Sequence, residues 1–139
     1  MKSKICIVSA NYYPEISSQM IKGVEKLIPN YSLIEVPGVF EIPVVISKNI
    51  NFFDGFIALG CVIKGETPHF DFISKSSINA LMKLSIQHNK PIGNGILTCL
   101  NKEQALKRAD PTKKNKGGEA AMALVSILKV FNENTNEKK

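Results

Sequence analysis

The segment Lys64-Gly65-Glu66-Thr67-Pro68-His69 holds the densest set of side chains that could do chemistry. Thr67 is a favourable N-cap residue and Pro68 suits a first helical position, so we expect a helix to begin here. Free amide groups at a helix N-terminus bind anions, and Gly65 allows a tight turn beside them. His69 falls in the first turn, where the positive end of the helix dipole favours a neutral imidazole that can accept and pass a proton. The alternative for His69 is a surface side chain that makes only a capping contact.

The stretch from Asn101 to Gly118 is basic, with six cations against two anions, in a chain of net charge +6. Such a patch attracts phosphate esters, nucleic acids or acidic lipids, although a solvated lysine-rich loop has the same composition. Arg108 is the only arginine among the eighteen cations of the chain. Because a guanidinium binds phosphate through two parallel hydrogen bonds, Arg108 is predicted to be a phosphate ligand.

Aromatic rings follow two of the predicted strands. In the segment 37–41, Phe40 stands beside the carboxylate of Glu41, a combination that suits a flat heterocycle with a hydroxylated substituent. Tyr12 and Tyr13 follow the first predicted strand and offer rings for stacking. The alternatives are an ordinary turn with Phe40 in the core, and tyrosine rings that only pack.

Several sheet-based activities lack their motifs. Neither GxGxxG nor GxxxxGK[ST] occurs, so phosphate-loop nucleotide binding is unsupported, and the absence of GxSxG argues against a serine hydrolase. A receiver domain needs acidic side chains where this chain has Asn11-Tyr12 and Cys61. The three cysteines, Cys6, Cys61 and Cys99, lie far apart without metal-ligand spacing. We therefore predict buried free thiols on strands.

Strand-like and helix-like segments alternate along the chain. Continuous apolar runs predict strands at residues 4–10, 31–36, 53–63 and 92–99. Apolar residues at helical spacing, with their boundary signals, predict helices at residues 15–28, 39–50, 68–89, 101–109 and 117–131. Pro43 is compatible with the helix at 39–50 only in its first turn.

This order predicts a three-layer α/β/α sandwich with a central parallel four-stranded sheet and flavodoxin-like topology. We expect one domain over residues 1–139, with the polar residues 132–139 forming a frayed tail. Ligands of such sheets bind beyond the carboxyl ends of the strands, where the loops described above would converge.

The composition fits this fold. The chain has 139 residues, of which 44% are hydrophobic and 22% charged, as in ordinary globular proteins. No apolar run reaches the roughly 18–20 residues that span a bilayer. The start, Met1-Lys2-Ser3-Lys4, leads into a short apolar run without the cleavage site of a secretory signal. We therefore expect a soluble, cytoplasmic protein that is not bound to a membrane.

Three sequence blocks stand in a characteristic order and spacing. They are VPGVFEIP at 36–43, LGCVIKGETPHFDFI at 59–73, and EQALKRA with NKGGEAA within 103–121. Together they resemble the 6,7-dimethyl-8-ribityllumazine synthase family of riboflavin biosynthesis, and the resemblance covers nearly the whole chain.

The resemblance implies a transferase that uses two small-molecule substrates. It condenses 5-amino-6-ribitylamino-pyrimidinedione with 3,4-dihydroxy-2-butanone 4-phosphate to give 6,7-dimethyl-8-ribityllumazine, with release of phosphate and water. No metal or organic cofactor is expected. The implied partners are further copies of the chain in a homopentamer, with sites between adjacent subunits, and riboflavin synthase as the pathway partner; no nucleic acid is expected. The few residues before the first predicted strand favour a bare pentamer over an icosahedral shell of twelve pentamers, and the sequence leaves the size of the assembly open.

The resemblance also implies roles for individual residues. His69 corresponds to a histidine that shuttles protons, Arg108 to an arginine that holds the substrate phosphate, and Lys116 to a lysine near that phosphate. Tyr12 corresponds to an aromatic residue that stacks on the pyrimidine. The other implied contacts to the ring, the ribityl chain and the phosphate are Val39, Phe40, Glu41, Cys61, Val62, Ile63, Gly65, Glu66, Thr67 and Asn94.

Two positions depart from the usual pattern of the family. Asn11 stands where an arginine is usual, and Asn94 stands where a neighbouring subunit usually offers an aromatic ring. These departures motivate a second hypothesis, a catalytically weak relative that binds flavin or lumazine. A third hypothesis is an anion- or nucleic-acid-binding module that uses the lysines of residues 113–116. Few aromatic residues interleave with that patch, which argues against it.

Overall fold

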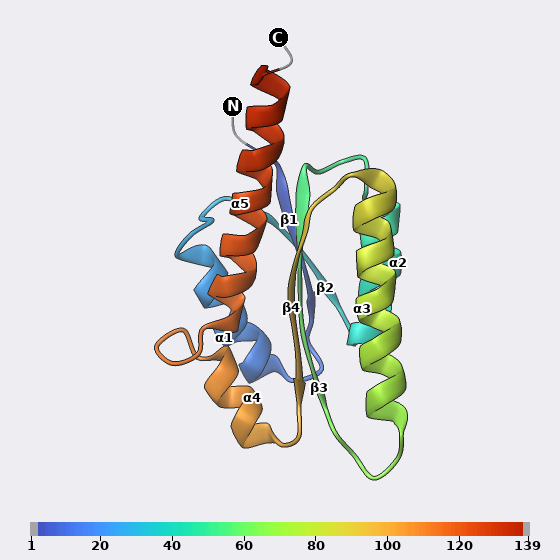
Figure 1. The fold of residues 1–139 in the computed structure, drawn as a ribbon. Helices are drawn as coiled ribbons and strands as arrows, with labels where there is room; N and C mark the ends of the chain where they lie inside the picture. Colours follow the sequence, from blue (N-terminus) through green and yellow to red (C-terminus); the bar gives the residue numbers. More distant parts are fainter. Residues whose placement is uncertain (1–2, 138–139) are drawn as a thin grey trace.

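A parallel sheet runs through the centre of the chain, with helices on both of its faces (Figure 1). The structure, a computed structural model, describes residues 3–137. Its four strands are β1 (Ile5–Ala10), β2 (Ser32–Val36), β3 (Gly55–Ile63) and β4 (Ile92–Cys99). All neighbouring strands are parallel, and their order across the sheet is β2-β1-β3-β4.

The helices divide between the two faces of the sheet. They are α1 (Pro14–Glu25), the 3-10 helix η1 (Val39–Glu41), α2 (Ile42–Lys48), α3 (His69–His88), α4 (Lys102–Ala109) and α5 (Lys116–Glu137). Helices α1, α4 and α5 cover one face, and α2 and α3 cover the other (Figure 1). The predicted three-layer α/β/α sandwich is confirmed.

Two predicted helices differ from those in the structure. The predicted helix at 39–50 is divided into η1 and α2, and Pro43 lies in the first turn of α2, where a missing amide hydrogen costs nothing. The predicted end of the last helix at residue 131 is wrong, because α5 continues to Glu137. The frayed tail expected over residues 132–139 stays a prediction. Residues 138 and 139 lie outside the described part of the chain.

Two apolar clusters hold the layers together, one on each face of the sheet. Every residue of β1 is buried, which explains its continuous apolar run. Ile7 packs into the cluster under α1, α4 and α5, while Val8 packs into the cluster under α2 and α3. Cys6, Cys61 and Cys99 are buried free thiols, as predicted.

The carboxyl ends of the strands meet at one edge of the sheet, the lower edge in Figure 1. The loops into α1, α3 and α4 begin there, together with the turn that leads from β2 into η1. The predicted site residues should therefore gather at this edge of the sheet.

Among residues 3–137, no helix is both long enough and apolar enough to cross a bilayer.

Candidate active site

A cavity of about 720 Å³ opens at the carboxyl ends of β1, β2 and β3. This volume lies within the range of about 300–1,000 Å³ that small-molecule sites occupy. Four segments far apart in the sequence contribute to its wall. The lining residues are Tyr12, Tyr13, Pro37, Gly38, Val39, Phe40, Glu41, Cys61, Val62, Ile63, His69 and Ile73.

His69 is the first residue of α3, and its exposed side chain reaches this cavity. The predicted boundary is one residue off, because Pro68 and not Thr67 is the N-cap. Thr67 still contributes to the cap, since its Oγ1 accepts the backbone N–H of His69 at 3.4 Å. The imidazole therefore lies at the positive end of a 20-residue helix, beside amide groups that can also receive an anion.

The turn after β2 supplies an aromatic ring and a carboxylate. Pro37 follows the last residue of β2. Gly38 is the N-cap of η1 and has an extended backbone, and the Gly38 carbonyl accepts the N–H of Glu41 at 3.2 Å. Phe40 is 64% exposed, so the ring faces outward instead of filling the core. The Glu41 carboxylate folds back over Gly38, because a Cβ added there would lie 3.1 Å from its Oε1. Both side chains are thus available to a ligand in the cavity.

Two tyrosines form the wall that follows β1. Tyr12 is 72% exposed and Tyr13 is half-buried against the core. Their ring centroids lie 4.9 Å apart with an interplanar angle of 79°, an edge-to-face arrangement. Burial is the main cause that raises the pKa of Tyr13, with the Cys61 thiol and Tyr12 adding to it and the Lys102 ammonium opposing it. The Tyr13 ring thus sits between the cavity and the start of α4.

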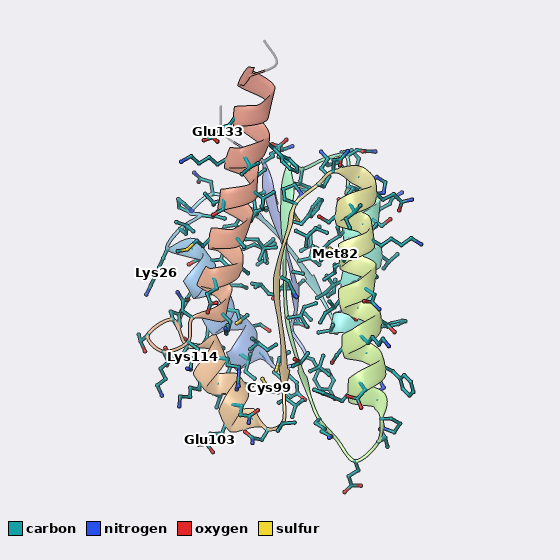
Figure 2. All side chains as sticks on the ribbon, viewed as in Figure 1. Lys26, Met82, Cys99, Glu103, Lys114 and Glu133 are labelled. Carbon is teal, nitrogen blue, oxygen red and sulfur yellow. The ribbon has the colours of Figure 1, made fainter. Side chains whose placement is uncertain are left out.

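Arg108 lines a different, smaller cavity of about 370 Å³ on the α4 side of the sheet. Its Nη1 donates to the backbone carbonyl of Gln104 at 3.3 Å, which directs the guanidinium along α4. The remaining lining residues are Asn101, Glu103, Gln104, Lys107 and Lys114. Figure 2 labels Glu103 and Lys114 on this side of the molecule. Among the residues that the structure describes, none lines both this cavity and the one at His69.

Two buried thiols lie near the carboxyl ends of the neighbouring strands β3 and β4. Cys99, labelled at the lower end of β4 in Figure 2, is 1% exposed, and the Arg108 guanidinium and the Cys61 thiol lie near enough to influence its pKa. Cys61 itself lines the larger cavity. Burial raises the pKa of Cys61 to about 12, and burial also raises the pKa of Cys99, with Arg108 opposing it. Both thiols therefore stay protonated near neutral pH, and both pack in the apolar cluster under α1, α4 and α5.

Eight of the fourteen predicted residues line the larger cavity and six do not. Gly65, Glu66 and Thr67 form the exposed loop before α3. A tight turn is not the reason for Gly65, since it has no positive φ and an added Cβ would meet nothing within 4 Å. Arg108 lies in the second cavity, as described above.

The last two predicted residues also lie away from the larger cavity. Asn94 is exposed on the edge strand β4, and its Oδ1 accepts the N–H of Ile96 at 3.0 Å. Lys116 begins α5 and forms an ion pair with Glu119 at 3.2 Å. Neither residue lines one of the two cavities described here.

The wall of the larger cavity also contains Tyr13 and Ile73, which are not among the predicted site residues. Sequence reasoning offers Tyr13 as a stacking ring without assigning it to the site, although Tyr13 directly follows Tyr12. Ile73 lies one helical turn after His69, and this i, i+4 spacing is a usable signal. The lysine that lines the cavity of Arg108 is Lys114, whereas the predicted lysine is Lys116. Nothing in the sequence alone distinguishes these two lysines.

Known proteins match this chain closely. The profile of the 6,7-dimethyl-8-ribityllumazine synthase family matches residues 2–132. A protein of that name from Bartonella tribocorum is 43% identical over 143 residues, which cover 96% of this chain and 95% of the relative. The protein of the same name from Bartonella bacilliformis is 42% identical, with coverage of 94% and 93%. The one from Methylocella silvestris is 42% identical over 132 residues, with coverage of 87% and 80%.

Proposed function

The chain belongs to the 6,7-dimethyl-8-ribityllumazine synthase family, and we infer from this membership that it is a transferase of riboflavin biosynthesis. It condenses 5-amino-6-ribitylamino-pyrimidinedione with 3,4-dihydroxy-2-butanone 4-phosphate. The amine and the ketone form an imine, phosphate leaves, and ring closure gives 6,7-dimethyl-8-ribityllumazine, with release of water. The reaction asks the protein for a platform for the ring, an anchor for the phosphate and a group that moves protons.

We propose that the larger cavity holds the pyrimidine. The exposed ring of Tyr12 offers a stacking face, and the outward ring of Phe40 lies on the same cavity wall. The carboxylate of Glu41 accepts hydroxyl groups of the ribityl chain, while Val39 and residues 61–63 form the apolar floor. Holding two substrates in contact supplies much of the rate, because it replaces a bimolecular encounter.

His69 is the proposed proton shuttle. Its imidazole reaches the cavity and is exposed, so it can exchange protons with solvent between the steps. The imine and elimination steps both move protons, and one histidine typically contributes about 10²–10⁴-fold to such steps. No metal ion or organic cofactor is invoked for any of these steps.

The phosphate anchor is proposed to come from Arg108, with Lys116 nearby and the backbone of residues 65–67 as a cradle. In one chain Arg108 and His69 line separate cavities, which motivates a site shared by two subunits. A ring-shaped homopentamer brings the Arg108 cavity of one subunit to the His69 cavity of the next through a head-to-tail interface. Asn94, exposed on the edge strand β4, would then face the neighbouring subunit's pyrimidine.

We further propose that residues 1–139 act as one cytoplasmic domain and that riboflavin synthase consumes the product. The match of one family model to residues 2–132 supports a single domain, and the place of the family's product in riboflavin biosynthesis supports the partner.

The observation that carries the site assignment is the convergence of eight predicted residues, including His69, on one cavity of suitable size. Its test is a direct assay in which the protein is mixed with both substrates and the fluorescent lumazine is followed. We expect His69→Ala to slow turnover by about one to three orders of magnitude. His88 lies at the other end of α3 and is exposed, so His88→Ala is the matched control and should keep the parental rate.

Two results would contradict this proposal. Turnover no faster than the uncatalysed reaction, together with tight binding of the lumazine, would favour a binding protein. A His69→Ala variant as fast as the parent would leave His69 with a capping role alone.

A further inference from the structure

The Tyr12 ring is an unusual stacking platform because it is 72% exposed. An exposed side chain is restrained by few contacts, and fixing its rotamer when a ligand binds costs binding free energy. Tyr12 makes an edge-to-face contact with the ring of Tyr13, whose centroid lies 4.9 Å away. The orientation of the platform therefore depends on how firmly Tyr13 is held.

Tyr13 is held through its backbone. It is the N-cap of α1, and its carbonyl accepts the N–H groups of Ile16 and Ser17, each at 3.0 Å. The buried hydroxyl of Ser17 donates to the same carbonyl at 3.2 Å and to the carbonyl of Ala10 at 2.8 Å. These bonds tie the end of β1 to the first turn of α1, so the position of the Tyr13 Cα is well determined.

The Tyr13 side chain is also confined. Its ring packs on the core cluster under α1, α4 and α5, and the Cys61 thiol lies close enough to raise the pKa of the phenol. On the outer side, Lys102 forms an ion pair with Glu15 at 2.5 Å and joins the first turns of α4 and α1 beside the ring. Tyr13 is thus enclosed by three elements, whereas Tyr12 projects into the open cavity.

We propose that Tyr13 is a positioning residue whose edge-to-face contact fixes the orientation of the Tyr12 ring and so leaves a face of Tyr12 open to the ring substrate. This inference rests on the proposed use of the cavity for the pyrimidine. The phosphorylated substrate does not stack, so its binding is independent of Tyr13. The hydroxyl of Tyr13 is not required, because the contact with Tyr12 is made by the ring.

The test compares Tyr13→Leu, which keeps an apolar side chain without a ring, with Tyr13→Phe, which keeps the ring. Edge-to-face pairs contribute enough to predict that Tyr13→Leu raises KM for the pyrimidine about two- to tenfold. The KM for the butanone phosphate and kcat should stay within about twofold of the parent. Tyr13→Phe should restore the parental KM. If Tyr13→Leu loses its far-UV circular dichroism, Tyr13→Met replaces it in the same comparison.

A double-mutant cycle separates positioning from a general packing defect. In a Tyr12→Ala background, where no ring remains to be held, removal of the Tyr13 ring should not change KM for the pyrimidine further. An equal increase of KM in both backgrounds would overturn the inference, and so would an unchanged KM in Tyr13→Leu. If the parent itself fails to form lumazine, the proposed function fails, and the cycle is then repeated on equilibrium binding of the lumazine with the same criteria.

Discussion

Gly117 is predicted to be required for the close contact between α5 and α1. A Cβ added to Gly117 would overlap the backbone carbonyl oxygen of Met20 and lie 2.9 Å from its carbonyl carbon and 3.0 Å from its Cα. All three are backbone atoms of a buried helical residue, so no side chain can turn aside to relieve the overlap. Gly117→Ala must therefore push α1 and α5 apart.

The size of the effect follows from two opposing contributions to the free energy of unfolding. Carbon atoms in good contact lie about 3.5–4.0 Å apart, so the helices must separate by roughly 0.5–1 Å. Overpacking of this kind costs about 1–3 kcal/mol. Alanine in place of glycine gains up to about 1 kcal/mol in a helix interior, and less near the first turn where Gly117 lies. Because only backbone atoms are in the way, the cost should lie at the upper end of its range, and after the gain is subtracted we expect a net loss of about 2 kcal/mol.

Urea denaturation followed by far-UV circular dichroism measures this loss. With an m value of about 2 kcal/mol/M, the midpoint should fall by about 1 M at equal protein concentration. Gly65→Ala is the matched control, because an added Cβ there meets nothing within 4 Å and φ is not positive. Its free energy of unfolding should stay within about 0.5 kcal/mol of the parent. Equal midpoints for the two variants would refute the close approach of α1 and α5.

Two further predictions concern buried polar groups. Ser17→Ala removes a buried hydroxyl that is hydrogen-bonded to the carbonyls of Ala10 and Tyr13, so it should lower the free energy of unfolding by about 1–2 kcal/mol. Ser18→Ala is the control, because Ser18 is exposed, and it should leave the free energy of unfolding unchanged. Equal urea midpoints for the two variants would contradict this prediction. Burial raises the pKa of Cys61 from 9.0 to about 12, and since only the thiolate reacts, iodoacetamide at pH 8 should alkylate Cys61 about a thousandfold more slowly in the folded chain than in urea. The rate, read by mass spectrometry, should rise with pH up to about 12; fast labelling at pH 8 would show that the site is open.

Most of the fold can be predicted because local signals and burial agree. The run from residue 4 to residue 10 is apolar throughout, and β1 is buried on both faces. Pro43 is admissible only in a first turn, and it lies there. The predicted helix at 39–50 begins as a 3-10 helix, η1, which follows Pro37 and Gly38 and precedes α2. The apolar pattern does not distinguish a 3-10 helix from an α-helix. Helix α5 extends beyond residue 131 although its last residues are polar, because helical periodicity marks burial and not the end of helical structure.

The candidate site is predictable to the extent that topology controls it. Loops that follow parallel strands meet at one sheet edge, so His69, Tyr12 and Glu41 are expected together, and they line one cavity. The resemblance to a family supplies roles that composition and spacing alone leave open. The separation of Arg108 from this cavity within one chain does not follow from composition and spacing, because it depends on which face of the sheet α4 packs against. Only the resemblance, which implies sites between adjacent subunits, allows for it.

Complementation tests directly whether the active site is assembled from His69 of one subunit and Arg108 of the next. His69→Ala and Arg108→Ala chains, each carrying a different affinity tag, are coexpressed and the mixed oligomers are isolated. In a head-to-tail ring, a one-to-one random mixture restores intact pairs at about one quarter of the sites, so lumazine formation should reach about one quarter of the parental rate. The mixed oligomers must fold and assemble like the parent for this comparison. If their rate of lumazine formation does not exceed the summed rates of the two separate variants, the site is not shared between subunits and the proposal is wrong.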